Sequence, residues 1–187
     1  MGNKLNEIRE RIMKINQKMP RDELEQHLAD FIKSHNVCVL ATASKDGVPL
    51  ATPIWCNSKG TTLYMVADAG TTKLANIRAN PRVSIGINDP RPSFQSVKGI
   101  QIWGEAKLIT EDNPEYEEAL KNYESEERTK TVTRQMAELL GMEPPEETGE
   151  IKVPRDVTII KVEAKKIALT ESALLAKGYA PRQFWEA

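Results

Sequence analysis

The chain opens with two stretches in which apolar residues recur at helical spacing. The first stretch predicts a helix over residues 4–18, and the second predicts a helix over residues 22–36. The apolar positions are Leu5, Ile8, Ile12 and Ile15 in the first helix and Leu24, Leu28, Phe31 and Ile32 in the second. An apolar stripe needs a surface to pack on. We therefore expect both helices to cover a sheet or a partner subunit.

The pattern then changes to short apolar and β-branched runs separated by turns. It predicts strands at residues 37–43, 49–56, 61–67, 82–87 and 97–110, with a short helix over residues 74–80. Pro49 and Pro53 cannot donate ladder hydrogen bonds, so we expect them at an edge, at a strand start or at a bulge. Gly104 in the fifth strand is the expected position of a bulge.

Charged residues dominate the next part of the chain. We expect helices over residues 114–128 and 132–140 and a surface linker or mobile loop over residues 141–154. The helices form either a lid or a solvated decoration, and their many glutamates favour decoration. Residues 157–162 and 166–170 then predict one or two strands. The expected organisation is a helical extension at residues 1–20 and a domain at 21–187, with a helical insertion at about 113–155.

Six or so short strands joined mostly by hairpins favour a mainly β protein. The expected fold is an antiparallel β-barrel with peripheral helices. A doubly wound dinucleotide-binding sheet is excluded, because the chain also lacks the GxGxxG turn.

Composition and charge exclude several classes of partner and site. The 187 residues carry 26 basic and 27 acidic side chains, so a nucleic acid or an acidic membrane is not the expected partner. The amino terminus lacks the apolar core of a secretory signal, and we expect a cytoplasmic protein. Cys38 and Cys56 have no metal-binding spacing and are expected in the core, and His27 and His35 are expected on a helix surface. No metal site is predicted.

The segment Asp68–Lys73 lies between the third strand and the short helix, and it is the candidate for binding an anion. At such a position, backbone N–H groups and the positive end of the helix dipole point at one spot, and Thr71, Thr72 and Lys73 add two hydroxyls and an ammonium. A cofactor phosphate fits this chemistry. The alternative is that a threonine hydroxyl only caps the helix.

The order of several short motifs resembles the FMN-binding split-barrel family typified by pyridoxamine 5′-phosphate oxidase. The resemblance covers roughly residues 25–110, with a weaker likeness at 156–170. The motifs are Ala41-Thr42-Ala43, Asp46-Gly47-Val48-Pro49, Thr52-Pro53-Ile54-Trp55, Leu63-Tyr64, Thr71-Thr72-Lys73, Asn80-Pro81-Arg82-Val83 and Ile102-Trp103-Gly104-Glu105-Ala106. The resemblance implies a six-stranded split barrel that forms a homodimer, with one FMN in each of two grooves between the subunits.

The resemblance also implies which residues bind the cofactor. Two strand segments would border the flavin, and the loop before the short helix would hold the phosphate. Gln101 from the neighbouring subunit would reach the polar edge of the ring, and the alternative for it is an exposed strand glutamine with no ligand contact. These residues are Thr52, Pro53, Ile54, Trp55, Val66, Ala67, Thr71, Thr72, Lys73 and Gln101. Trp55 is the best candidate for contact with the ring by position, and the alternative for it is packing in the core or at the dimer interface. Catalytic residues stay unidentified.

Departures from the family pattern argue against oxidation of vitamin B6. Pyridoxamine phosphate oxidases carry arginines at the positions of Thr52 and Thr72 and a lysine near Asn57, and this chain has lost these three cations. Their carboxy-terminal Arg-x-His element is also missing, because the tail after Arg182 has no histidine. Fewer charge-assisted bonds predict weaker or differently oriented cofactor binding.

The leading hypothesis is an FMN-dependent oxidoreductase that transfers electrons or hydride on a small redox substrate. One alternative is a non-catalytic flavin-binding or electron-carrier protein. A second is a reductase that uses a deazaflavin (F420). The last is an interaction module in which residues 68–73 only cap a helix.

Overall fold

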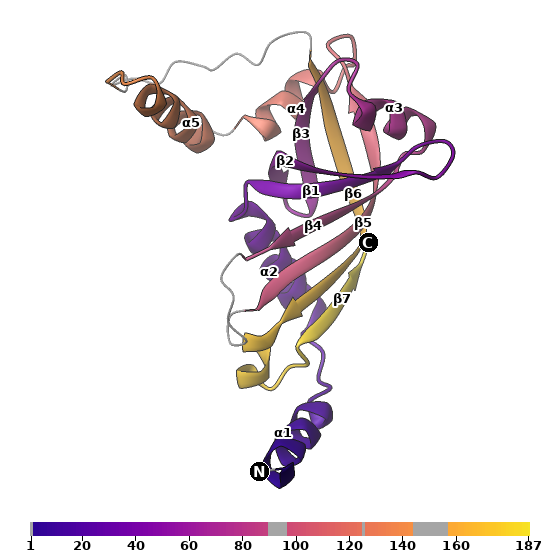
Figure 1. Cartoon of the computed structure of the whole chain (residues 1–187), viewed down its shortest axis with the longest axis vertical. Helices are drawn as coiled ribbons and strands as arrows, with labels where there is room; N and C mark the ends of the chain where they lie inside the picture. Colours follow the sequence, from indigo (N-terminus) through magenta and orange to yellow (C-terminus); the bar gives the residue numbers. More distant parts are fainter. Residues whose placement is uncertain (1, 90–96, 125, 144–156) are drawn as a thin grey trace.

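The computed structural model describes residues 2–89, 97–124, 126–143 and 157–187 (Figure 1). The helices are α1 (Gly2–Lys14), α2 (Arg21–Lys33), α3 (Thr72–Ala79), α4 (Tyr116–Tyr123), α5 (Glu126–Leu139) and the 3₁₀ helix η2 (Ser172–Lys177). The strands are β1 (Val37–Ala43), β2 (Pro49–Lys59), β3 (Thr62–Asp68), β4 (Arg82–Asn88), β5 (Lys98–Ile109), β6 (Val157–Glu171) and β7 (Arg182–Glu186). Most of the predicted linker at 141–154 lies outside the described residues.

Six of the strands form a closed antiparallel barrel in the order β3-β2-β1-β4-β5-β6, and β6 pairs back onto β3. The predicted mainly β fold with peripheral helices is confirmed. The two predicted strands near the carboxyl end are one long strand, β6, which also pairs with a seventh strand, β7. Residues 182–186 were not predicted as a strand.

The barrel is split along β2. Only residues 56–59 of this strand pair with β3, whereas residues 49–55 pair with β1. From the pair Cys56 and Met65 onward, β3 continues along β6 and leaves β2. Pro49 starts β2 and Pro53 lies in its diverging part, as predicted for residues that cannot donate to a ladder. The sheet therefore opens between these two strands.

Alternation along the strands fills the barrel with aliphatic side chains such as Leu40, Met65, Ile102 and Ile160. The α2 helix packs against the barrel through the four predicted apolar residues, all of which are buried. Cys38 and Cys56 are free and buried in this core, as predicted. By contrast, α1 projects away from the barrel, and Leu5 and Ile8 on it are about half exposed (Figure 1).

The predicted bulge lies beside Gly104, but the extra residue belongs to β6. Trp103 pairs with Lys166 and Gly104 pairs with Ala164, which leaves Lys165 unpaired in the register. A Cβ on Gly104 would lie 2.6 Å from the Glu163 carbonyl oxygen. Glycine is needed here because the backbone of β6 approaches too closely for a side chain.

The predicted decoration at 114–128 is instead a docked element. The α4 helix places Tyr116 and Ala119 on Tyr64, Ile109 and Ile159, which form a second buried cluster on the outside of the barrel. The second helix of this region, α5, begins at Glu126, well before the predicted residue 132. The insertion therefore starts with a fixed helix.

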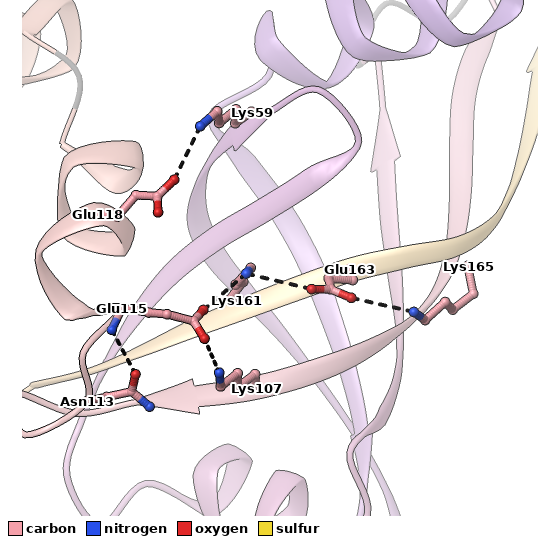
Figure 2. A network of polar contacts seen from close by, with 8 residues as sticks. All are labelled: Lys59, Lys107, Asn113, Glu115, Glu118, Lys161, Glu163 and Lys165. Atoms are coloured by element: carbon pink, nitrogen blue, oxygen red, sulfur yellow. Dashed lines mark hydrogen bonds and ion pairs between the residues drawn. The ribbon is translucent and has the colours of Figure 1, made fainter. Parts of the chain in front are cut away.

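A polar network holds the amino-terminal end of α4 (Figure 2). Glu115 accepts hydrogen bonds from Lys107 on β5 and, at 3.2 Å, from Lys161 on β6. Glu118 forms an ion pair with Lys59 at 3.3 Å. Because the lysines lie on three barrel strands, the network fixes the position of α4.

We expect this anchoring to weaken in acid. Hydrogen bonds from Lys107 and Lys161 hold the pKa of Glu115 below its ordinary value of 4.5. A carboxylate with a lowered pKa in the folded state stabilises that state above its unfolded pKa, and this contribution is lost as the pH falls through the folded value. Hydrogen exchange of α4, measured relative to β6, should therefore rise below about pH 4.5.

In Glu115→Gln this acid-dependent step should be absent, and α4 should exchange faster at neutral pH. Glu117→Gln, on the exposed side of the same helix, is the matched control and should behave as the parent chain. An unchanged acid step in Glu115→Gln would assign the effect to another group.

Candidate functional site

The loop between β3 and α3 reverses the chain at Gly70. This residue has a φ of +82°, a backbone conformation that glycine adopts without strain. Thr71 follows as the residue before the helix, and its carbonyl accepts the Leu74 amide at 3.0 Å. The first N–H groups of α3 therefore point out of the helix beside Thr71, Thr72 and Lys73.

The Thr71 hydroxyl is buried and has no hydrogen-bond partner. It forms no capping bond with α3, so the capping alternative is wrong for this residue. An unpaired buried hydroxyl costs roughly 1–3 kcal/mol, and a ligand that bonds with it offsets this cost. Lys73 is half-exposed and has no ion-pair partner among the described residues. A hydroxyl and an ammonium therefore lie together at the amino-terminal end of α3.

The α3 helix holds this loop beside the split. Asn76 on α3 donates a hydrogen bond of 3.0 Å to the hydroxyl of Thr42, and both side chains are buried. Thr42 is the cross-strand partner of Leu50 at the start of β2. The predicted phosphate loop therefore lies where β2 and β3 are already apart.

The predicted strand residues lie on the two sides of the split. On β2, Thr52 and Ile54 are half-buried, while Pro53 and Trp55 are exposed on the outer face. On β3, Ala67 is buried in the barrel core and Val66 packs against the cluster beneath α4. Because Val66 and Ala67 use their side chains for packing, their backbone atoms are what they offer to a ligand.

Gln101 is not brought together with the other predicted residues. Cross-strand pairing places Pro53, Val39, Gly86 and Gln101 in one row across β2, β1, β4 and β5. Three strand spacings of about 4.8 Å separate Pro53 from Gln101 by roughly 14 Å. Within one chain, Gln101 and the split therefore lie on separate parts of the outer face.

Gln101 instead lines a groove on the outer face, with a volume of about 680 Å³. The groove has an apolar floor that includes Val39, Gly86 and Ala168, and Arg182 stands at its edge. The Arg182 guanidinium lies 5.2 Å from the centre of the Phe184 ring. Sequence reasoning did not identify Arg182 as a residue of this groove, because residues 182–186 were not predicted as a strand. The strand has Arg182 and Phe184 exposed and Gln183 and Trp185 buried, which is the alternation of a strand with one buried face.

The side chains of Cys38, Cys56 and His27 form contacts with other side chains of the protein. A hydrogen bond with Cys56, together with burial, raises the pKa of the Cys38 thiol, which stays protonated and is a poor nucleophile. His27 is half-buried and lies 2.6 Å from a Glu171 oxygen, so it bridges α2 and β6. The described residues include no cluster of three or more His, Cys, Asp or Glu side chains that could hold a metal. None of the described helices has both the length and the apolar character needed to cross a membrane.

Comparison with known proteins matches this architecture. A family model described as pyridoxamine 5′-phosphate oxidase matches residues 24–170. A conserved hypothetical protein from Mycobacterium tuberculosis is 21% identical with a TM-score of 0.56, and the match covers 81% of this chain and 87% of that chain. ChuZ from Campylobacter jejuni is 20% identical with a TM-score of 0.57, covering 94% and 63%. A FAD-binding protein from Mesorhizobium loti is 17% identical with a TM-score of 0.52, covering 76% and 88%. Comparison with curated proteins finds no match.

Proposed function

The chain belongs to the pyridoxamine 5′-phosphate oxidase family, and we propose from this that it is an FMN-binding, oxidoreductase-like homodimer that transfers electrons or hydride on a small substrate. The observation that carries the proposal is the buried, unpartnered Thr71 hydroxyl beside Lys73 at the first turn of α3. Such a site suits a phosphate, which accepts hydrogen bonds from hydroxyl, ammonium and helix N–H groups together.

The residues present fit a flavin mononucleotide. Thr71, Thr72 and Lys73 would hold the phosphate, and the segment Thr52–Trp55 would border the flavin on one side of the split. The backbone at Val66 and Ala67 would border it on the other side. A bound flavin supplies the redox chemistry, and the protein supplies binding, orientation and access.

Vitamin B6 oxidation is not the proposed reaction. The oxidases have a lysine near the position of Asn57, and the Asn57 side-chain amide donates a hydrogen bond of 3.2 Å to the Tyr123 carbonyl of α4. The position is thus used to hold the insertion. Thr52 and Thr72 carry no positive charge that would replace the missing cations.

A homodimer completes the site in this proposal. The outer face carries exposed apolar side chains on four strands, and Gln101 lies beside them. These apolar residues are Val37, Val39, Trp55, Trp103 and Phe184. Large exposed apolar patches mark interaction sites. A two-fold axis running along the strands between Val39 and Gly86 would place Gln101 of each subunit opposite Pro53 of the other.

We expect Gly86→Glu to separate the dimer without unfolding the subunit. In the single chain a Cβ on Gly86 meets no atom within 4 Å, so the larger side chain has space. In the proposed dimer its charge would be buried without a partner, at a cost of roughly 3–5 kcal/mol, which weakens association by at least about 100-fold. Light scattering should report the mass of one chain, and bound FMN should be lost with the dimer.

Lys33→Glu is the control for a charge change, because Lys33 is exposed on α2. It should keep the dimer and the flavin. A Gly86→Glu protein that remains dimeric, with an unchanged unfolding midpoint, would show that another face forms the interface.

The cofactor itself is tested by releasing and weighing whatever small molecule accompanies the purified chain. The mass of FMN is the expected result. The mass of FAD or of a deazaflavin (F420) would show that FMN is not the cofactor. A colourless protein that does not bind added FMN would contradict the proposal. Turnover of a nicotinamide against an electron acceptor separates an enzyme from a flavin carrier, since a carrier gives no steady rate.

A further inference from the structure

Two helices of the chain carry apolar stripes that the single chain leaves exposed. On α1, Leu5 is 53% exposed and Ile8 is 48% exposed. On α5, Met136 is 55% exposed and Leu139 is 86% exposed. Helices of 13 and 14 residues are marginal in water without a packing partner. Each therefore needs a surface that covers its stripe.

The α1 stripe has the spacing of a coiled-coil seam, and the exposed pair on α5 fits one step of the same spacing. On α1, Leu5, Ile8 and Ile12 are separated by three and then four residues. On α5, the exposed side chains of Met136 and Leu139 are separated by three residues. Alternation of three and four is the pattern of side chains that interdigitate with a second helix. A seam of this kind fits another helix better than it fits a flat sheet.

The two helices of one chain cannot reach each other. Figure 1 shows α1 and α5 at opposite ends of the long axis of the molecule. The chain just after α1 is fixed to the carboxyl-terminal segment, because the Gln17 carbonyl accepts hydrogen bonds from the Ala180 amide at 2.9 Å and from the Gln183 amide group at 3.3 Å. From that anchor, the 13 residues of α1 extend only about 20 Å.

A two-fold axis exchanges the ends of a molecule that lies across it. The axis of the proposed dimer runs along β1 and β4, and Figure 1 shows β1 crossing the long axis of the molecule. The end of one subunit that carries α1 would therefore lie near the end of the other subunit that carries α5. The same contact would form twice.

We propose that α1 of each subunit packs against α5 of the other subunit of the homodimer, seam to seam. The inference rests on the dimer in the proposed function. The occupant of each exposed seam is thus a second copy of this chain, and residues 1–20 act as an arm that joins the subunits.

Charge favours this pairing over one between two α1 helices. Lys4, Arg9 and Arg11 flank the α1 seam. Arg11 forms an ion pair with Glu7 at 3.2 Å, so Lys4 and Arg9 are the charges that would repel those of a second α1 seam. Gln135, which lies beside Met136 on α5, is exposed and uncharged. The α5 seam therefore accepts α1 without repulsion.

Hydrogen exchange of the whole dimer tests the pairing through its reciprocity. We expect Leu5→Asp/Ile8→Asp to speed amide exchange in residues 126–139 by at least about 10-fold, because a lone helix of this length is marginal. Met136→Asp/Leu139→Asp should speed exchange in residues 2–14 in the same way. Glu10→Gln and Glu138→Gln are the exposed polar controls on the same helices and should change neither segment.

Cross-linking tests whether the pair forms between chains. Two copies with different tags, one with Ile8→Cys and the other with Leu139→Cys, are mixed, refolded together and oxidised. A disulfide that joins the two tags supports the proposal, and the buried Cys38 and Cys56 should not compete. The proposal would be overturned if exchange in the partner helix stayed unchanged or if no disulfide joined the two tags. A chain carrying both Ile8→Cys and Leu139→Cys is the further test, and a disulfide formed only within that one chain would also overturn the proposal. A protein that binds FMN as a dimer and gives any of these results rejects the helix exchange alone, whereas a monomer rejects the dimer and the exchange together.

Discussion

Replacing Lys73 with alanine should weaken FMN binding by roughly 10- to 100-fold. A hydrogen bond to a charged group contributes about 1.5–3 kcal/mol, and each 1.4 kcal/mol is a tenfold change in Kd. Lys73 has no described ion-pair partner, so its removal leaves no carboxylate unpaired and should change the free energy of unfolding little. Titration of FMN fluorescence against the apoprotein measures the loss.

A second variant separates phosphate binding from helix capping. Thr71→Val removes the buried unpartnered hydroxyl while keeping the side-chain shape. If the hydroxyl serves a phosphate, the variant should bind FMN more weakly, and its apoprotein should be as stable as the parent chain or about 1 kcal/mol more stable. If the hydroxyl were a cap, the apoprotein would instead lose about 1 kcal/mol.

Lys177→Ala is the matched control for the lost positive charge, because Lys177 is exposed on η2. It should leave the Kd for FMN unchanged. An equal loss of affinity in Lys177→Ala and Lys73→Ala would mean that the net charge of the chain, and not a site at α3, attracts the phosphate.

Gly104→Ala should destabilise the barrel by about 2–3 kcal/mol, the upper part of the roughly 1–3 kcal/mol that forcing extra atoms into a packed position costs. The added Cβ would lie 2.6 Å from the Glu163 carbonyl oxygen and 2.9 Å from a Val162 methyl carbon. Because one of these atoms belongs to the backbone, β5 and β6 must move apart. For a chain of this size we expect the unfolding midpoint to fall by roughly 4–12 °C.

Glu105→Ala tests the neighbouring position of the same strand, where the side chain is exposed. Its midpoint should stay close to that of the parent chain. If Gly104→Ala were equally harmless, the backbone of β6 would have room to move away from β5. The register irregularity at Lys165 would be the place where that movement occurs.

Strand-like runs and turn residues sufficed to predict the mainly β fold, because β1 to β5 are short runs rich in apolar and β-branched residues between recognisable turns. The α4 helix was misjudged as decoration, although Tyr116, Ala119 and Tyr123 recur at helical spacing among its glutamates. Charge counts hid a narrow apolar face. Such a face is enough for a helix that is clamped at one end by Glu115 and at the other by Asn57.

The candidate site was only partly within reach of sequence reasoning. The approach of Thr71, Thr72 and Lys73 to a helix end follows from local sequence, and so do the roles of prolines in β2. The burial of the Thr71 hydroxyl and the separation of Gln101 from Pro53 depend on how strands far apart in the chain align. Local patterns contain no information about that alignment.

The pairing of β3 with β6 joins residues that lie between 89 and 101 positions apart. Bringing such distant segments together costs chain entropy before their contacts form. We therefore infer that the pairing of β3 with β6 forms late and limits the folding rate. The cost of closing a loop grows only with the logarithm of its length. A lineage is therefore free to lengthen or shorten the helical insertion between these strands at little thermodynamic cost, which makes this stretch a natural place for new specificity to evolve.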